Sequence, residues 1–265
     1  MNKNIKIITS INNPYIKELM HLKEKKYRII NKSFLVEGKH LVEEAYKENR
    51  LKEIIFINDK DILAFPNVQA IKVNADIIKK LSDTINPQEI MGVCEIKDID
   101  VDYNKYKRIL VLDTISDPGN MGTLIRSAIG FNIDLIVCSN DSCDIYNSKV
   151  VRSTQGAIFK IPIIYCDLTS EIDKMKKHNF MVISTSLDAT MTINEINNCN
   201  NNNNSNCNNN CYAIILGNEA AGVKKEIQTL ADVNVIIPIN KKLESLNVSV
   251  AGSIMMYELD KKGNI

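Results

Sequence analysis

Hydrophobic positions along this chain follow two alternating patterns. Short continuous apolar runs bounded by turn residues predict buried strands, and segments with apolar residues three or four positions apart predict helices that bury one face. In the first part of the chain the predicted strands lie at 34–37, 51–57, 68–73 and 90–96, and the predicted helices at 39–49 and 75–81. Because strands and helices alternate, we expect a small α/β domain here.

The same alternation returns after a break and continues towards the C-terminus. The predicted strands lie at 109–112, 133–138, 161–164, 180–185, 213–216 and 233–237. The predicted helices lie at 120–131, 148–159, 170–178 and 224–230, and an apolar helix ends near residue 259. Strands joined by crossover helices pair in parallel, so the predicted fold class is α/β with a parallel sheet.

The break itself, residues 97–107, is polar and charged without an apolar period, and we interpret it as a linker between domains 1–96 and 108–265.

Residues 197–210 interrupt the second domain. Eleven of these fourteen residues are Asn, a composition that cannot build a core and that predicts a mobile surface loop. Cys199, Cys207 and Cys211 match no zinc spacing and have no His nearby, so we expect no metal site.

Composition and charge narrow the function classes only slightly. The formal net charge is +1, so any nucleic-acid surface must be a local patch. The chain has no apolar run of membrane-spanning length and no signal-peptide pattern, and its seven cysteines lack a paired framework. We therefore expect a cytoplasmic protein without a membrane partner. The basic helix within residues 1–31 is either a solvated face or a contact for phosphates.

Candidate chemistry gathers where the strands at 213–216 and 233–237 end. Gly217, Asn218, Glu219 and Gly222 follow the first strand, and Pro238 closes the second. The ends of neighbouring parallel strands form a crevice in which ligands bind. Glycines allow the backbone to approach a ligand closely, and Glu219 adds a carboxylate at the rim. We interpret this region as a cofactor cradle.

A second polar loop follows the strand at 109–112. Pro118 and Gly119 predict a turn, and Asn120 is a candidate cap for the next helix. Arg126 lies on that helix beside apolar residues. It either extends from the helix face into solvent or points at a phosphate or ribose in the crevice.

Three motifs together resemble a known family. They are Asp117-Pro118-x-Asn120-x-Gly122-x-x-x-Arg126, then Gly217-Asn218-Glu219-x-x-Gly222, then Ile237-Pro238-Ile239 with Ser245-Leu246-Asn247-Val248-Ser249-Val250-Ala251. In this order they resemble the SpoU (TrmH) family of RNA 2'-O-ribose methyltransferases, in the SPOUT superfamily, and in particular its bacterial members that modify ribosomal RNA. The first 96 residues resemble the RNA-binding accessory domain of such enzymes, which has the fold of kink-turn-binding ribosomal proteins.

The resemblance implies several properties that the residue pattern alone does not give. The C-terminal segment would form a trefoil knot, and the protein would be a homodimer with its active site near the subunit interface. S-adenosylmethionine would bind in a bent shape in the knot loops. The positions that match the cofactor-binding ones are Thr185, Gly217, Ile237 and Leu246.

The resemblance also implies roles for five side chains. Family proposals make Arg126 the proton acceptor, although so basic a group rarely gives up its proton, and holding a phosphate or favouring the alkoxide is the safer role. Asn120 would orient Arg126 or the ribose, and Glu219 would organise the loop. Asn247 and Ser249 would bind cofactor or ribose, or else only cap the last helix.

The predicted function is S-adenosylmethionine-dependent 2'-O-methylation of a ribose in 23S ribosomal RNA. A transfer-RNA enzyme of the same family is the near alternative. From another class, a non-catalytic RNA-binding protein for ribosome assembly remains open, although the five side chains argue against it. No Gly-x-Gly-x-x-Gly follows a predicted strand, which argues against a nucleotide-dependent oxidoreductase.

Overall fold

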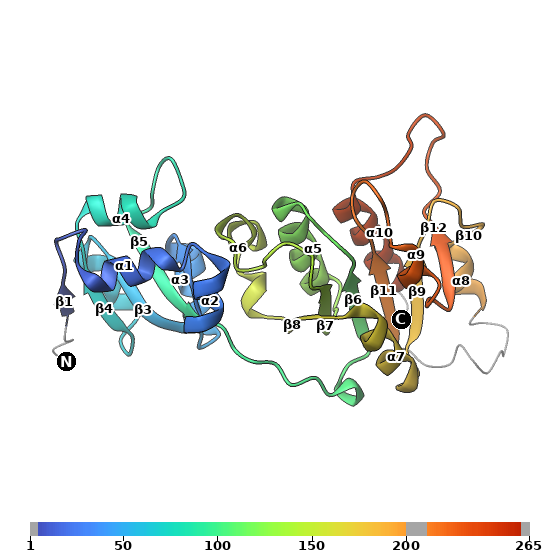
Figure 1. Ribbon diagram of the computed structural model, residues 1–265, viewed down its shortest axis with the longest axis horizontal. Helices are drawn as coiled ribbons and strands as arrows, with labels where there is room; N and C mark the ends of the chain where they lie inside the picture. The colour runs from blue at the N-terminus through green and yellow to red at the C-terminus, as the bar shows by residue number, and fades with distance from the viewer. Residues whose placement is uncertain (1–4, 200–210, 261–265) are drawn as a thin grey trace. The chain divides into compact units, whose positions relative to one another are not determined.

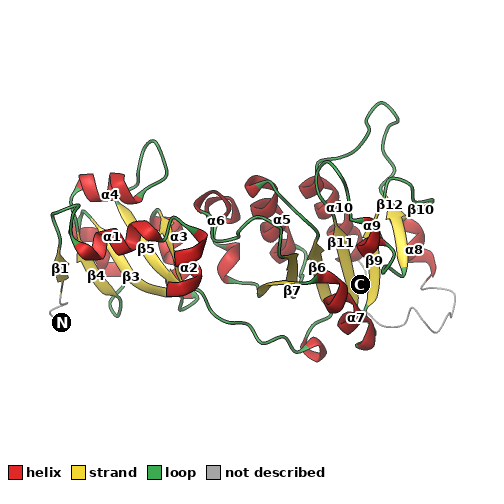
Figure 2. Ribbon diagram, viewed as in Figure 1, coloured by secondary structure: helices red, strands yellow, loops and turns green. Residues whose placement is uncertain are grey.

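The computed structural model describes residues 5–199 and 211–260, with the backbone alone at 197–199. By its internal contacts the chain divides into two compact units (Figures 1 and 2). One contains the chain up to Asp98 together with Asp144–Lys160, and the other contains Ile99–Cys143 and the chain from Ile161 onward.

The first unit is a five-stranded sheet covered by helices on both faces. Its strands are β1 (Ile5–Ile7), β2 (Ser33–Glu37), β3 (Leu51–Phe56), β4 (Gln69–Lys72) and β5 (Ile90–Glu95), in the order β1-β4-β3-β5-β2. Its helices are α1 (Pro14–His21), α2 (Lys25–Asn31), α3 (Lys39–Lys47), η1 (Asp59–Ala64), α4 (Ala75–Leu81), α6 (Ser148–Thr154) and η3 (Ala157–Phe159). Strand β5 runs antiparallel to β2 and β3, and the other pairs are parallel.

The two faces of this sheet are covered by different helices. Ile16 and Leu19 of α1 and Ile77 of α4 pack on the face that carries Ile55 and Met91, in one buried cluster. On the other face α3 lies over Gly92, where a Cβ atom would come within 3.5 Å of a methyl group of Val42. The apolar spacing in α1, α3 and α4 thus positions these helices, as the sequence predicts for α3 and α4.

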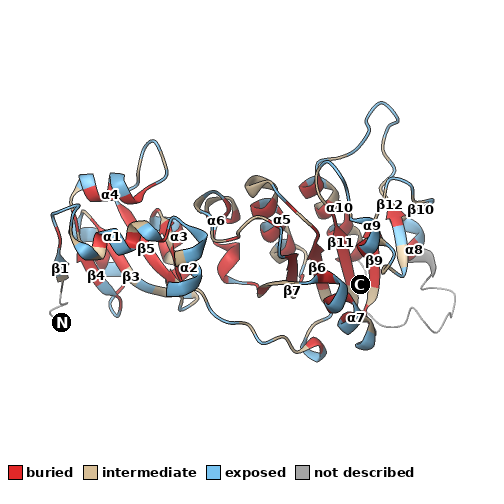
Figure 3. Ribbon diagram, in the orientation of Figure 1, coloured by how far each residue is buried: buried red, intermediate tan, exposed pale blue. Residues whose placement is uncertain are grey.

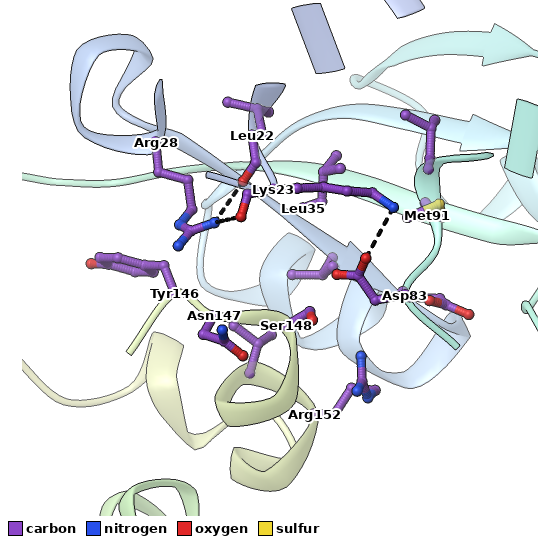
Figure 4. A pocket seen from close by; sticks show the side chains of 14 residues that line it. Leu22, Lys23, Arg28, Leu35, Asp83, Met91, Tyr146, Asn147, Ser148 and Arg152 are labelled. Carbon is purple, nitrogen blue, oxygen red and sulfur yellow. Dashed lines mark hydrogen bonds and ion pairs between the residues drawn. The ribbon is translucent and has the colours of Figure 1, made fainter. Parts of the chain in front are cut away.

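Helix α6 follows β7 in sequence but packs within the first unit. The Tyr146 ring packs in a tilted arrangement on Phe34, with 4.6 Å between the ring centroids, and the Arg28 guanidinium donates to the Asp144 carboxylate at 2.5 Å. A small cavity of about 50 Å³ remains beside the helix, lined by both apolar and charged side chains (Figure 4). Two of its cations are already paired, Lys23 with Asp83 at 2.9 Å and Arg28 with Asp144.

The second unit is built on a seven-stranded sheet in which every neighbouring pair is parallel. Its strands are β6 (Arg108–Leu112), β7 (Leu135–Ser139), β8 (Ile163–Cys166), β9 (Met181–Thr185), β10 (Met191–Thr192), β11 (Tyr212–Leu216) and β12 (Val233–Ile236), in the order β10-β12-β9-β11-β6-β7-β8. Its helices are η2 (Tyr103–Lys105), α5 (Pro118–Gly130), α7 (Leu168–Lys177), α8 (Ile193–Cys199), α9 (Lys225–Gln228) and α10 (Val248–Asp260). The predicted α/β class with a parallel sheet is therefore confirmed.

Helices cover both faces of this sheet as well. Ile172 and Met175 of α7 and Ile227 of α9 join the alternate residues of the central strands in one core cluster. On the opposite face, a Cβ atom at Gly252 of α10 would lie 2.5 Å from Leu216 and 2.6 Å from Leu124. Glycine at that position lets α10 approach the sheet and α5 closely. The central strands β6, β7 and β11 are buried, whereas the connection between β12 and α10 is largely exposed (Figure 3).

Several local features differ from the predicted pattern. Helix α5 begins at Pro118 rather than at residue 120, and its cap is Asp117, whose carboxylate accepts the Asn120 N–H at 2.8 Å. The expectation that Asn120 caps this helix is therefore wrong, because Pro118 occupies the first helical position and the residue before it, Asp117, is the cap. The helix predicted at 148–159 breaks at Gln155 and Gly156, which both have positive φ.

Two other features, the burial of Tyr103 and the extent of α8, were not predicted from the hydrophobic pattern. Tyr103, within the segment interpreted as a linker, is buried and donates to Glu171 at 2.5 Å. Helix α8 extends to Cys199, so the first residues of the Asn-rich segment are helical, and residues 200–210 lie outside the described residues. Within the described ranges no helix is both long and apolar enough to cross a bilayer, and no cluster of three metal-ligating side chains occurs.

Candidate active site

A cavity of about 310 Å³ opens at the carboxyl ends of β9, β11 and β12. Three segments line it: the loop that follows β9, the loop that follows β11, and the connection from β12 into α10. The positions predicted to bind the cofactor all line this cavity, namely Thr185, Gly217, Ile237 and Leu246. Parallel strands that end side by side leave such a crevice because their loops diverge above the sheet.

The loop after β11 folds tightly back on itself. Asn218 and Gly222 exchange two backbone hydrogen bonds of 2.9 Å each. The Asn218 side chain accepts the N–H groups of Ala220 and Ala221 at 2.9 and 3.1 Å. A Cβ atom at Gly217 would lie 2.1 Å from the backbone carbon of Gly222, so a side chain there is incompatible with the turn. The fold of its own loop is therefore what requires glycine at position 217.

Glu219 links this loop to the one that follows β6. Its carboxylate accepts the Ser116 hydroxyl at 3.0 Å, the Asp117 N–H at 3.2 Å and the Asn120 side-chain amide at 3.1 Å. Partial burial raises the pKa of this carboxyl, but the hydrogen bonds, with that from Asn120 first, outweigh it and hold the pKa below its usual value. Glu219 is thus an acceptor that joins the loop after β11 to the loop after β6.

Asn120 and Asn247 connect the third segment to the same network. The Asn247 side-chain amide donates to Asn120 Oδ1 at 2.9 Å. Asn247 Oδ1 in turn accepts the Ser249 N–H at 2.9 Å and the Ser249 hydroxyl at 2.6 Å. Asn247 therefore caps α10 and, in addition, ties the start of that helix to α5. The structure brings Asn120, Glu219, Asn247 and Ser249 together through side chains that contact one another.

Arg126 lies apart from this network. It is exposed on α5 and does not line the cavity of its own chain. Among the described residues it has no hydrogen-bond or ion-pair partner. Leu124 and Ile125 beside it are buried, and Ser127 contacts Ser253 of α10 at 2.8 Å. The helix thus directs this guanidinium to solvent, where it remains available to a partner molecule.

Sequence reasoning missed the group that anchors the loop after β11 at its far end. The Asp113 carboxylate, only 1% exposed, accepts the Lys224 N–H at 2.7 Å and the Thr114 hydroxyl at 3.0 Å. Thr114 has φ 57°, rare for a β-branched residue, and its carbonyl accepts the Asn218 amide at 2.9 Å. An Asp directly after a buried apolar strand could have predicted this role. A carboxylate at such a position is buried and must therefore have hydrogen-bond partners.

We expect Asp113→Ala to lower the free energy of unfolding by about 2–3 kcal/mol, because it removes a buried carboxylate and leaves the Lys224 N–H and the Thr114 hydroxyl without their charged acceptor. Urea unfolding of the purified protein measures this loss. Asp141→Ala is the matched control. Asp141 is half exposed and pairs with the Lys224 ammonium at 2.6 Å, so its removal should cost less than about 1 kcal/mol. Equal losses in the two variants would contradict the anchoring role of Asp113.

Two protein-family models match this chain. Residues 107–257 match the model of the SpoU rRNA Methylase family, and residues 13–92 match an MRM3-like substrate binding domain. The chain belongs to the SpoU rRNA methylase family. The SpoU match spans β6 to α10 and thus includes every segment that lines the cavity.

Relatives of known name extend over nearly the whole chain. The 23S rRNA (guanosine(2553)-2'-O)-methyltransferase RlmP of Bacillus subtilis is 32% identical over 96% of this chain and 99% of its own. A solved RNA 2'-O ribose methyltransferase is 26% identical, covers 98% of this chain and 100% of its own, and superposes with a TM-score of 0.79. The AdoMet-bound rRNA methyltransferase of Sinorhizobium meliloti is 26% identical over 97% of this chain and 98% of its own, with a TM-score of 0.84.

These findings confirm three predictions made from the sequence. The chain is a SpoU-family RNA 2'-O-ribose methyltransferase, its cofactor is S-adenosylmethionine, and its fold is that of the family. The cavity fits that cofactor. Leu216, Ile237 and Leu246 give it an apolar wall suited to a purine ring, and the adjoining loops offer backbone donors and acceptors.

Proposed function

We propose that this enzyme methylates the 2'-hydroxyl of a ribose in 23S ribosomal RNA. The observation that carries the proposal is the cavity at the ends of β9, β11 and β12, bordered by the Glu219–Asn120–Asn247 network. The full-length similarity to RlmP of Bacillus subtilis supports the choice of RNA. We therefore favour ribosomal RNA over the transfer-RNA alternative as the substrate. A ribosomal substrate also favours the cytoplasm as the site of action.

The domains have separate tasks in this proposal. Residues 1–96 bind the RNA, residues 97–107 link the two parts, and residues 108–265 carry the methyl transfer. The match of residues 13–92 to a substrate binding domain supports the first assignment. The basic side chains of α1 and α2 provide phosphate contacts in that role, among them Lys17, Lys25 and Lys26, which are exposed.

S-adenosylmethionine supplies a methyl group on a sulfonium, which leaves as a neutral thioether. The protein must therefore position the ribose, exclude water and help remove the proton from the 2'-hydroxyl. Thr185, Gly217, Ile237 and Leu246 hold the cofactor in this scheme. Asn120, Asn247 and Ser249 act as positioning residues, because their side-chain polar groups hold the loops to one another. Glu219 fixes the loop after β6 and does not accept the proton.

Arg126 interacts with the RNA in this proposal. Its guanidinium holds the phosphate next to the reacting ribose and stabilises the developing alkoxide. Because it does not line the cavity of its own chain, we infer that it completes the site of a second copy in a homodimer. The α10 face beside α5 supports such an interface, since Val250 and Tyr257 on it are 47% and 49% exposed.

The trefoil knot also belongs to this proposal. Strand β12 pairs with β9 on one side of β11, whereas α10 packs on α5, which follows β6 on the other side. The connection from β12 to α10 must therefore cross the end of β11, where Leu246 and Gly217 line one cavity. This path supports a C-terminal segment that threads past the loop after β11.

Two measurements test the proposed function. Calorimetry with S-adenosylmethionine should give saturable binding to the purified protein, and transfer of labelled methyl groups should favour 23S rRNA over tRNA. A map of 2'-O-methyl sites in rRNA and tRNA from a strain without this protein should then lack one site in 23S rRNA. Tight RNA binding without cofactor binding would instead favour a non-catalytic assembly protein.

A further inference from the structure

The charged side chains that line the cofactor cavity are all acidic. Among the described residues that border it, Asp188 and Glu219 are the only ones with an ionisable side chain, and Lys, Arg and His do not occur. S-adenosylmethionine carries two cationic groups and one carboxylate, so a cavity wall of negative charge suits it. A carboxylate can bind one of these cationic groups or another donor of the cofactor only if it is not already bound by the protein.

Glu219 is already occupied by the protein. Both of its oxygens accept hydrogen bonds, Oε1 from Asp117 and Asn120 and Oε2 from Ser116. Each of these bonds holds the loop after β6 against the loop after β11. A ligand that recruited this carboxylate would have to break them.

The Asp188 carboxylate, in contrast, is not bound by any residue that the structure describes. Its carboxylate is exposed and has no hydrogen-bond or ion-pair partner among the described residues. Its backbone is nevertheless fixed, because the Asp188 N–H donates to the Ser186 hydroxyl at 3.2 Å. The Ser186 N–H in turn donates to the Val235 carbonyl of β12 at 2.9 Å. The loop after β9 therefore presents an unpartnered carboxylate at the cavity from a backbone that is held in place.

We propose that Asp188 is a cofactor-binding residue whose carboxylate accepts a hydrogen bond from an N–H or O–H group of S-adenosylmethionine. The proposal rests on the proposed function, because it assumes that this cavity holds the methyl donor. The chemical partner is either the ammonium of the methionine part or a hydroxyl of the adenosine ribose. Both are donors that a carboxylate recognises well.

Titration calorimetry of the full-length protein tests this assignment. Asp188→Ala should weaken S-adenosylmethionine binding roughly ten- to hundredfold, the usual effect of removing a charged hydrogen-bond acceptor. Asp188→Asn keeps an acceptor oxygen and should show a smaller loss. Asp173→Ala is the matched control, since Asp173 is exposed on α7 and does not line the cavity. Its Kd should equal that of the wild type, and thermal unfolding of the free proteins should be unchanged in all three variants.

Binding of adenosine and S-adenosylhomocysteine identifies which group of the cofactor contacts Asp188. These measurements also distinguish a failure of this proposal from a failure of the proposed function. A parallel loss for adenosine identifies the ribose, and a loss for S-adenosylmethionine and S-adenosylhomocysteine but not adenosine identifies the ammonium. Both results support the proposal. A loss confined to S-adenosylmethionine overturns it, because the sulfonium offers no hydrogen to donate. Wild-type affinity in both Asp188 variants also overturns it while leaving the proposed function intact, whereas a wild-type protein that binds no S-adenosylmethionine defeats the function itself.

Discussion

Replacing Arg126 with alanine should lower methyl transfer by about 100- to 1,000-fold while leaving the fold and the affinity for S-adenosylmethionine unchanged. The guanidinium is exposed and has no partner among the described residues, so its loss breaks no contact within the subunit. In the proposed mechanism it contacts the RNA phosphate and the alkoxide only when substrate is bound. Single-turnover methylation measures the rate, and calorimetry measures the cofactor affinity.

Two further variants make the Arg126 result specific. Arg126→Lys keeps the charge but not the planar pair of donors, so it should recover only part of the rate. Lys177→Ala removes an exposed positive charge from α7 and should methylate RNA normally. Normal turnover in Arg126→Ala would remove Arg126 from the catalytic residues. A loss of cofactor affinity in that variant would instead make it part of the cofactor site.

Replacing Gly217 with alanine should abolish measurable cofactor binding. The new Cβ atom would lie 2.1 Å from backbone atoms of Gly222 and Val223, and neither backbone segment can rotate away as a side chain would. The loop must therefore open, which breaks the paired bonds between Asn218 and Gly222 and deforms the cavity wall. We expect more than about a 100-fold increase in Kd and a loss of stability of about 1–3 kcal/mol.

Gly130→Ala provides the control for this substitution. A Cβ atom at Gly130, the last residue of α5, meets no atom within 4 Å. Alanine there should leave cofactor binding unchanged and keep or slightly raise the melting temperature, because it reduces the entropy of the unfolded chain. Calorimetry and thermal unfolding of the two variants in parallel provide the comparison. Cofactor binding by Gly217→Ala at wild-type affinity would show that the cavity does not depend on the turn after β11.

The sequence determined the elements that depend on neighbours along the chain. Apolar runs identified the seven-stranded unit's central strands and the spacing of apolar residues identified α3, α4 and α7 as helices, because burial repeats with the period of the element. Motif residues at strand ends also identified the cavity, since parallel strands put their carboxyl ends at one edge. Short or irregular elements such as β1 and η2 were missed because they carry too few residues to establish a period.

Tertiary structure alone decided what the site residues do to one another. Asn120 contacts Glu219 and Asn247, which lie 99 and 127 positions away in sequence, and no local pattern encodes such pairs. The same holds for Asp113, whose partner Lys224 comes from the far end of another loop. Helix α6, predicted as one more helix of the second domain, belongs to the first unit, where Tyr146 just before it packs on Phe34. Hydrophobic periodicity predicts that one face of an element is buried. Only the path of the whole chain determines which groups pack against that face. It likewise determines that Glu219 is bound by other loops while Asp188, without a partner among the described residues, remains free for a ligand.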